Sequence, residues 1–366
     1  MIRALSPYYI DTNLTYTPPG GSLTTCEKFT LNIWVWDGLK ASPDSTNSYQ
    51  VTYQNTSERT DSHKINVSPM VRDYIDFTQP SALIQLTTTG LISGNNQQWV
   101  YTYVTYDDDA STKHAESTEL MTLGYGNGLE GENYDTVTNN ILLKAQDYKV
   151  YNDGIFIFPV LASETTDRTI VMQLNGQAIG ATFNFTVPAT TDSSEMVQYL
   201  WVDLMNDFPN LERNDAVSLV YEGVSTVLVV EEECKYTPMS IMFQNKDGAL
   251  QSFTFFKEQI ESMSVTDELF ETNRGQAAVG YHQFVRYNVQ AKSVVQASSG
   301  YIHERENRNI KQLLLSERVW LYSGEAPYYK PLNIKDTSVK YKTRIKERLI
   351  NYVISFEMSF NEVNNI

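Results

Sequence analysis

The N-terminal third of the chain alternates between apolar and polar residues in several short runs. Phe29–Trp36 places Phe, Leu, Ile and Val at every second position and stops at the turn dipeptide Asp37-Gly38, and Trp99–Tyr106 is a similar run. A period of two is typical of strands that bury one face. Because polar loops join these runs, they predict a β-sandwich of the fibronectin type III or immunoglobulin kind over residues 1–117.

A second set of strand-like runs follows the polar stretch Ala110–Thr118. The clearest are Ile155–Val160 and Ile170–Leu174, and the latter leads directly into Asn175-Gly176. Both residues of an Asn-Gly pair tolerate a positive φ, so this pair predicts a type I′ hairpin turn. We therefore expect a second β-sandwich over residues 118–234.

Residues 235–366 predict a C-terminal β-rich assembly domain with one short helix. Ser240–Gln244 and Gln251–Phe256 flank Asn245–Gly248, whose Asp-Gly pair indicates a hairpin. Apolar residues recur at helical spacing in Glu304–Glu317, which is the predicted helix. The other expected strands are His282–Val289, Ser293–Ser298, Val319–Tyr322, Leu332–Ile334 and a long final strand, Ile350–Phe360. The fold class is thus mainly β, with tandem sandwiches before this domain.

Length and charge support a division into domains. The chain has 366 residues, more than the ~250–300 that one hydrophobic core usually holds. It carries 28 Lys and Arg against 44 Asp and Glu, a net charge of -16, of which residues 1–234 hold -19 and residues 235–366 hold +3. This balance excludes a chain whose main role is to bind nucleic acid or an anionic membrane, because binding to either requires clustered positive charge on the protein.

One segment, Lys335–Arg348, is locally basic within this acidic chain. We interpret it as a solvated strand-loop face or, alternatively, as a surface that meets an acidic neighbour such as a sandwich of another copy. Steering of DNA is a weaker alternative, because the segment is short and lacks interleaved aromatic residues.

The sequence contains no recognisable catalytic constellation, so we predict no enzyme activity, no cofactor and no metal. Its four histidines lack partners at metal-ligand spacing: His63, His114, His282 and His303. Gly124–Gly131 lacks the Lys-Ser/Thr that completes a phosphate loop and predicts a flexible loop. The acidic triplets Asp107–Asp109 and Glu231–Glu233 are consecutive, which places neighbours on opposite faces of a strand and does not make a hydrolase pair. A surface Ca²⁺ site at the first triplet is the alternative left open.

Targeting and redox features are sparse. Cys26 and Cys234 are far apart in the sequence, so we expect two unpaired small thiols with no disulfide or zinc site. The N-terminal residues lack the apolar stretch of a secretory signal. No run approaches the ~18 apolar residues of a membrane span, and the best candidate, Val224–Val230, has strand length; we therefore expect no membrane partner.

Three segments of the last section resemble sequences of a known group. They are CKYTPMSIMFQNKDGALQSFTFFKE at Cys234–Glu258, SGYIHERENRNIKQLLLSERVWLY at Ser299–Tyr322 and YKTRIKERLINYVISFEMSFNEVNNI at Tyr341–Ile366. Each is similar to a recurring pattern in virion structural proteins of tailed phages, especially Bacteroidetes-infecting and crAss-like phages. The N-terminal FTLNIWVWDG and INVSPMVRDYI are a weaker match to the same group. The resemblance implies a structural subunit of a tail, baseplate, neck ring or fibre, made in the host cytoplasm and located in the virion.

Such a subunit works by symmetric assembly with copies of itself and with other virion proteins. DNA in transit is an expected neighbour, but specific nucleic-acid binding is not expected. We expect the final strand and the basic segment before it to lie at a subunit interface. The candidate interface residues are Lys340, Lys342, Arg344, Lys346, Arg348, Tyr352, Phe356 and Phe360. The alternative function is a host-surface or glycan-binding adhesin, in which aromatic residues such as Trp34 and Trp36 stack on sugars in place of packing in a core or between domains.

Overall fold

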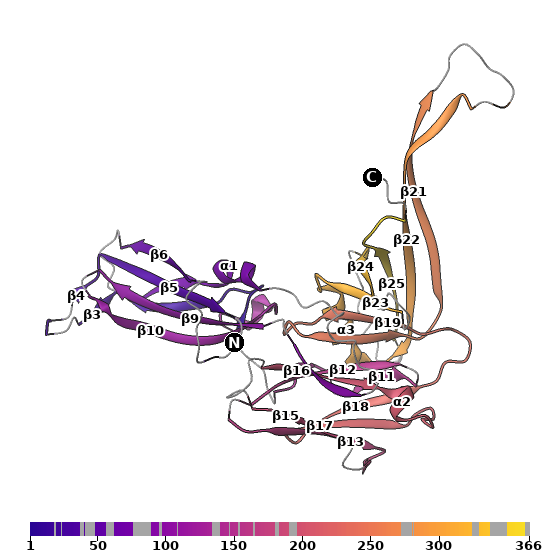
Figure 1. The fold of residues 1–366 in the computed structure, drawn as a ribbon, viewed down its shortest axis with the longest axis horizontal. Coiled ribbons are helices and arrows are strands. Elements are labelled where there is room, and N and C mark those ends of the chain that lie inside the picture. The colour runs from indigo at the N-terminus through magenta and orange to yellow at the C-terminus, as the bar shows by residue number, and fades with distance from the viewer. Residues whose placement is uncertain are drawn as a thin grey trace.

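The computed structural model shows a chain built mainly of β-strands, which confirms the predicted fold class. Its helices are short: α1 (Ser68–Val71), α2 (Leu204–Asp207) and α3 (Asn307–Leu314). Figure 1 shows three β-rich bodies and a long hairpin that projects from the last of them. The structure describes residues 1–17, 20–22, 24–36, 40, 48–55, 62–75, 89–94, 97–107, 109–133, 140–145, 147–152, 154–163, 165–179, 183–189, 196–271, 280, 282–323, 329–336 and 350–362.

A five-stranded sheet forms the centre of the N-terminal domain, in the order β1-β10-β9-β5-β6. Its strands are β1 (Ile2–Arg3), β5 (Lys28–Trp36), β6 (Ser48–Gln54), β9 (Gln97–Tyr106) and β10 (Asp109–Thr122). One face packs against α1 and against smaller strand pairs: β2 (Tyr9–Asn13) with β7 (Ser62–Asn66), and β3 (Thr15–Tyr16) with β4 (Thr24–Thr25). The alternating apolar residues of β5 all point into this core, as their period of two predicts.

The predicted boundary at residues 117 and 118 falls inside β10 and is therefore displaced. Asp109–Thr122 pairs with β9 as one strand, so the N-terminal sheet continues to residue 122. In the sequence, Ala110–Thr118 resembles a linker because it is polar and lacks hydrophobic alternation. The structure gives the reason: most of its side chains are exposed, and a strand that is exposed on both faces does not alternate.

The middle domain contains two sheets that share one core. The first sheet has the order β11-β18-β17-β13-β14, and β15 also pairs with β13. Its strands are β11 (Asp147–Tyr151), β13 (Arg168–Leu174), β14 (Gln177–Ala178), β15 (Asn184–Val187), β17 (Ala216–Tyr221) and β18 (Val224–Glu231). The second joins β12 (Ile155–Leu161) and β16 (Val197–Asp203) to β8 (Gly90–Ser93) from the N-terminal part of the chain. Asn175 and Gly176 adopt φ of 49° and 78°, which confirms the predicted hairpin turn. Assignment to the fibronectin or immunoglobulin kind stays a prediction.

The third domain is a seven-stranded sheet in the order β20-β19-β23-β24-β25-β22-β21. Its strands are β19 (Met239–Gln244), β20 (Leu250–Phe255), β21 (Gln259–Glu271), β22 (Phe284–Ile302), β23 (Val319–Tyr322), β24 (Tyr329–Ile334) and β25 (Ile350–Met358). Helix α3 buries Ile310 and Leu313 against this sheet. The hairpin of β19 and β20 and the helix are confirmed, although the helical segment begins with a 3₁₀ turn, Glu304–Glu306, and α3 ends at Leu314.

Two features of this sheet differ from expectation. The two strands expected within His282–Ser298 are one long strand, β22, and its partner β21 was not expected at all. The final strand, β25, lies between β24 and β22, so it offers no free backbone edge to another copy. Its alternate residues from Ile350 to Phe356 are buried in the core of the domain.

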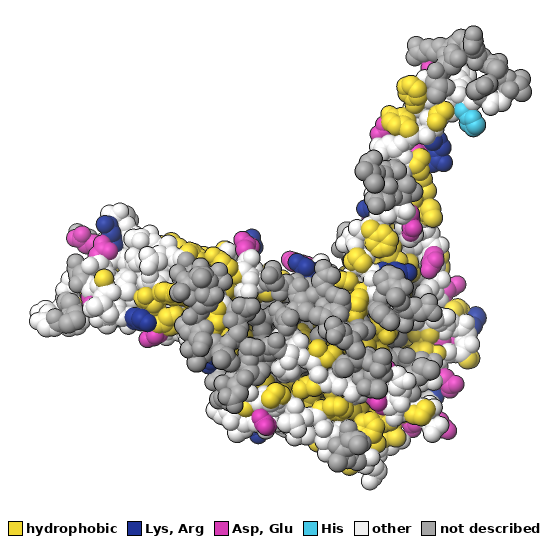
Figure 2. All heavy atoms as spheres, in the orientation of Figure 1, with side chains coloured by type: hydrophobic (Ala, Val, Ile, Leu, Met, Phe, Trp, Pro, Cys, Tyr) yellow, Lys and Arg dark blue, Asp and Glu magenta, His cyan; other side chains and the backbone are white. Residues whose placement is uncertain are grey.

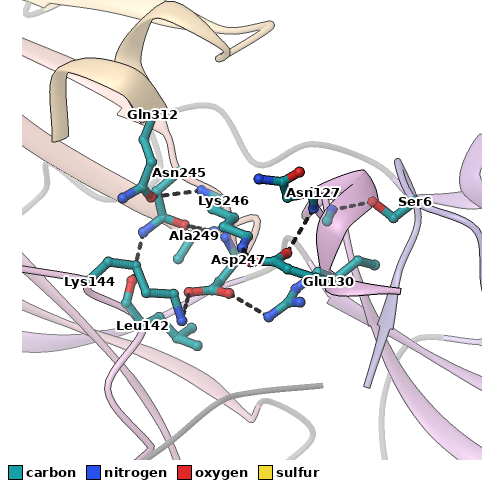
Figure 3. Close-up of polar contacts among 12 residues, drawn as sticks. Ser6, Asn127, Glu130, Leu142, Lys144, Asn245, Lys246, Asp247, Ala249 and Gln312 are labelled. Atoms are coloured by element: carbon teal, nitrogen blue, oxygen red, sulfur yellow. Dashed lines mark hydrogen bonds and ion pairs between the residues drawn. The ribbon is translucent and has the colours of Figure 1, made fainter. Parts of the chain in front are cut away.

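The three domains meet at the turn between β19 and β20. Asp247 in this turn is completely buried, and its carboxylate oxygens lie 2.8 Å from Nη2 of Arg3 and 2.9 Å from Nζ of Lys144 (Figure 3). The amide of Asn245 donates to the carbonyl of Leu142 at 2.7 Å, while its side-chain oxygen accepts from the backbone of Asp247 and Ala249. We call this arrangement the junction, because it ties the N-terminal strand, the middle domain and the third domain together.

Close backbone packing and an apolar cluster complete the junction. Gly248 has a φ of 82°, and a Cβ there would lie 2.8 Å from the nitrogen of Gly124, so only glycine fits the site. Around it, a buried cluster draws Trp36 and Trp99 from the first domain, Trp201 from the second and Trp320 from the third. Trp36 therefore packs between domains, one of the two roles weighed for it.

Removal of the Asp247 charge should destabilise the whole chain. In an Asp247→Asn variant, the buried guanidinium of Arg3 loses its carboxylate, and breaking a buried ion pair of this kind costs about 3–5 kcal/mol. We expect a large decrease in the urea midpoint of unfolding. Asp267→Asn is the matched control, because Asp267 pairs with Arg286 at the surface and its loss should change the midpoint little. Equal midpoints for the two variants would contradict this account of the junction.

Candidate functional site

Among the described strands and helices, the outer part of the β21–β22 hairpin is the most exposed. We define the arm as Met263–Glu271 of β21 together with Phe284–Ser293 of β22, which pair antiparallel over this whole length. Figure 1 shows the arm leaving the body of the third domain with no other labelled strand beside its outer half. Every residue of β21 from Ile260 to Phe270 is exposed, on both faces of the hairpin.

The exposed arm is rich in large apolar side chains (Figure 2). Half of the fourteen large apolar side chains that are exposed among the described residues lie on it: Met263, Val265, Leu269, Phe270, Phe284, Val285 and Tyr287. Leu269 is 65% exposed and Phe270 is 58% exposed. The rings of Phe270 and Tyr287 contact each other edge to face with centroids 6.4 Å apart. Exposed apolar clusters of this kind mark surfaces that another molecule covers.

Local interactions give the arm its shape. The register of the two strands shifts between Thr266 and Glu268, and Asn288 opposite this shift adopts a φ of 50°, which identifies a β-bulge. Asp267 accepts two hydrogen bonds from the Arg286 guanidinium, at 2.8 and 3.0 Å. The guanidinium holds the pKa of Asp267 below its usual value. A bulge twists a hairpin, so these contacts set the direction of the outer half relative to its base.

The base of the arm is anchored by the third domain. Glu357 of β25 pairs with Lys292 at 3.0 Å and with Lys335 at 3.1 Å, and hydrogen bonds to these two lysines lower its pKa. The backbone nitrogen of Glu362 donates to the carbonyl of Ala291 at 2.7 Å. The arm therefore begins from a fixed position, and its outer half extends beyond these contacts.

The candidate interface residues named from the sequence fall into three groups. Lys340, Lys342, Arg344, Lys346 and Arg348 fall outside the described residues. The side chains of Tyr352 and Phe356 are buried in the core of the third domain, so their assignment to an interface is corrected. The Tyr352 hydroxyl donates to Asn307 of α3, and the Phe356 ring contacts Phe255 of β20. Phe360 is 46% exposed and is the one described residue of that set with a large accessible apolar side chain.

A second surface lies beside α3, in a cleft of about 860 Å³. One wall is the glycine-rich segment Gly124–Gly131, and the other is the outward face of α3 with Arg308, Lys311 and Leu315. Lys144 and Lys246 also line the cleft, next to the junction. We call this the α3 cleft.

The glycine-rich segment is held in place at the α3 cleft, in contrast to the flexible loop that we expected. Asn127 and Glu130 cap the 3₁₀ turn Gly128–Glu130 reciprocally, and Glu130 also pairs with the ammonium group of Lys246. This pairing and the hydrogen bond from the Asn127 amide lower the pKa of Glu130 against the opposing effect of its desolvation. The amides of Gly126, Asn127, Leu129 and Glu130 already donate within the protein, so they do not form a phosphate cradle.

The four histidines lie in separate places. His63 packs near the ring of Phe29, His114 lies 4.6 Å from the ring of Tyr106, and His303 caps the 3₁₀ turn before α3. His282 precedes the outer end of β22.

The acidic triplet at Asp107–Asp109 is engaged locally where it is described. Asp109 accepts from Ser111 and Thr112, and these hydrogen bonds lower its pKa. No group of three His, Cys, Asp or Glu side chains suited to a metal ion occurs in the described part of the chain.

Both cysteines are free, Cys26 buried and Cys234 exposed. No helix in the described ranges has the length and apolar character needed to cross a membrane.

Glu306, the last residue of the 3₁₀ turn before α3, is a buried carboxyl group with a strongly perturbed pKa. Its burial raises the pKa to about 7, although a hydrogen bond from the His303 backbone acts in the opposite direction. The unfolded chain loses this proton near pH ~4.3. The folded state therefore binds more protons than the unfolded state between these two values, and its free energy of unfolding falls as the pH rises through that window.

A Glu306→Gln variant should remove this pH dependence, because glutamine keeps an acceptor for His303 but has no charge to desolvate. We expect the variant to gain stability relative to the parent protein by up to roughly 3 kcal/mol between pH 4 and pH 8. Urea unfolding across that range measures the difference. Glu304→Gln, an exposed position in the same turn, is the matched control. A stability difference that does not change with pH would refute the assignment.

Comparison of this sequence with models of known protein families and with curated proteins finds no match.

Proposed function

We propose that the protein is a non-enzymatic structural subunit that forms a symmetric multimer, and that the arm is its principal contact with a neighbouring subunit. The setting that we propose is the tail, baseplate, neck ring or fibre region of a tailed-phage virion, from the resemblance of the segments around Cys234–Glu258 and Ser299–Tyr322. Partners in that setting are further copies of the chain and other virion proteins.

The observation that carries the proposal is the apolar surface of the arm. A two-stranded hairpin is at best marginally stable alone in water, and one that exposes Leu269, Phe270 and Phe284 leaves apolar area in contact with solvent. Burial of such area on a neighbour contributes about 25 cal/mol for each Å² removed from water. An arm of this kind gains order and stability when another subunit covers it.

The junction supports the same proposal. Asp247 joins the three domains through buried contacts, so the base of the arm has a defined direction relative to the rest of the chain. A ring or tube needs such a fixed angle between one contact surface and the next, because the angle determines whether the assembly closes.

A glycan-binding adhesin is the second candidate, and one cluster of aromatic residues favours it. Trp34 stacks on Tyr103 with centroids 5.0 Å apart and lies beside Tyr101 on the N-terminal sheet. However, the ammonium group of Lys113 lies 4.7 Å from the Tyr103 centroid and 5.1 Å from that of Tyr101. Because this contact already occupies ring faces, the cluster offers less surface for sugar stacking than the arm offers for a protein partner.

Removal of the arm should prevent assembly without unfolding the chain. We suggest replacing Thr266–Gln290 with an Asn-Gly turn, which closes the hairpin at the paired residues Val265 and Ala291 and keeps the contacts of Ala291 and Lys292 at the base. We expect multimers of fixed mass for the parent protein in light scattering, and monomers with an unchanged circular dichroism signal from the body for the truncated variant.

A double substitution, Phe270→Ser with Phe284→Ser, should weaken assembly in the same direction while it keeps the full length of the arm. Tyr74→Ser is the matched control, since Tyr74 is an exposed aromatic residue of the N-terminal domain. A truncated variant with the parent multimer mass, or a parent protein that stays monomeric at high concentration, would refute the proposal.

A further inference from the structure

The α3 cleft is positively charged although the chain as a whole is acidic. Four cationic side chains line it, Lys144, Lys246, Arg308 and Lys311, against a single carboxylate, that of Glu130. Lys144 pairs with Asp247 and Lys246 pairs with Glu130. Arg308 and Lys311 form no ion pair with any described residue, and both are exposed on the outward face of α3. These two cations are therefore available to an acidic partner.

One large apolar side chain lines the same cleft. Leu315, at the end of α3, is 52% exposed there. Arg308, Lys311 and Leu315 are spaced by three and four residues, so they share one face of the helical segment, opposite to the buried Ile310 and Leu313. The α3 cleft thus combines two cations that have no ion pair among the described residues with one exposed leucine, and a matching partner would present carboxylates beside a large apolar group.

The outer half of the arm presents that combination. In β21, Glu268 shares one face with Phe270 and Glu271 shares the other face with Leu269, so each face carries a carboxylate beside a large apolar group; all four side chains lie at or near the surface. The outer half, Thr266–Glu271 with Phe284–Val289, contains three acidic residues and one arginine, a net charge of -2. Its charge and apolar character are therefore complementary to those of the α3 cleft.

We propose that the outer half of the arm of one copy docks in the α3 cleft of a second copy. Figure 1 shows the arm leading away from the body that carries α3, so the arm that fills the cleft comes from another molecule. This inference rests on the proposed function, because it names the receptor for the arm within the same multimer. Arm and cleft are different surfaces of the chain, so the contact is heterologous and repeats head to tail, which builds a ring when the rotation closes.

Charge reversal on each side tests the pairing in the full-length chain. Arg308→Glu with Lys311→Glu should raise the dissociation constant of assembly at least roughly tenfold, and Glu268→Lys with Glu271→Lys should do the same, because each places like charges opposite one another. All four substitutions in one chain restore opposite net charges on the arm and the cleft and should recover most of the lost affinity. Sedimentation velocity over a concentration series measures each constant.

Arg305→Glu is the matched control, since Arg305 is exposed beside α3 but does not line the cleft. Recovery of assembly in the fourfold variant supports the docking. Normal assembly of the Arg308 and Lys311 variant, together with loss of assembly on arm truncation, would overturn the docking and leave the proposed function intact. A cleft variant that assembles normally but loses affinity for a DNA oligonucleotide would likewise overturn it and assign the cleft to nucleic acid.

Discussion

The arrangement of the chain depends on one buried carboxylate. Asp247 lies in a tight turn of the third domain and contacts Arg3 from the N-terminal strand and Lys144 from the middle domain. A buried carboxylate with two cationic partners is strongly destabilised when either partner moves away, so the contact restricts the relative positions of three domains. The close approach of Gly248 to Gly124 acts in the same direction. Lys144 and Lys246 of the α3 cleft lie beside this centre, and the arm extends from the same seven-stranded sheet that contains the Asp247 turn.

Local patterns in the sequence predicted those elements whose burial leaves a periodic signal. The strands around Phe29–Trp36, the hairpin around Asn245–Gly248 and the helix before Leu315 were all identified correctly, because one face of each packs against a core. Strand β21 was missed because both of its faces are exposed, which removes alternation. The contact between Arg3 and Asp247 spans 244 positions and leaves no local pattern.

The candidate site was harder to predict than the fold. Alternation in the last strand is real, but the sequence does not say whether the apolar face meets the strand's own domain or a partner. The structure places Tyr352 and Phe356 in the domain core and surrounds β25 with strands on both sides. The signal for the arm was present in another form: Leu269 and Phe270 are adjacent apolar residues in an acidic segment without a buried face. In a sequence, such a pair is equally compatible with burial in a core. The structure shows that no core surrounds these two residues, and only then does the pair indicate exposed apolar surface.

The central claim is that the arm is covered by a neighbouring subunit in the working state. Hydrogen exchange at the backbone amides of β21 and β22 tests it directly, because it reports on each strand of the arm separately from the body. The account predicts that exchange of Thr266–Phe270 and Val285–Val289 slows as protein concentration rises and multimers form, while exchange in β19 stays constant. Exchange in the arm that is independent of concentration, in a sample that does form multimers, would contradict it.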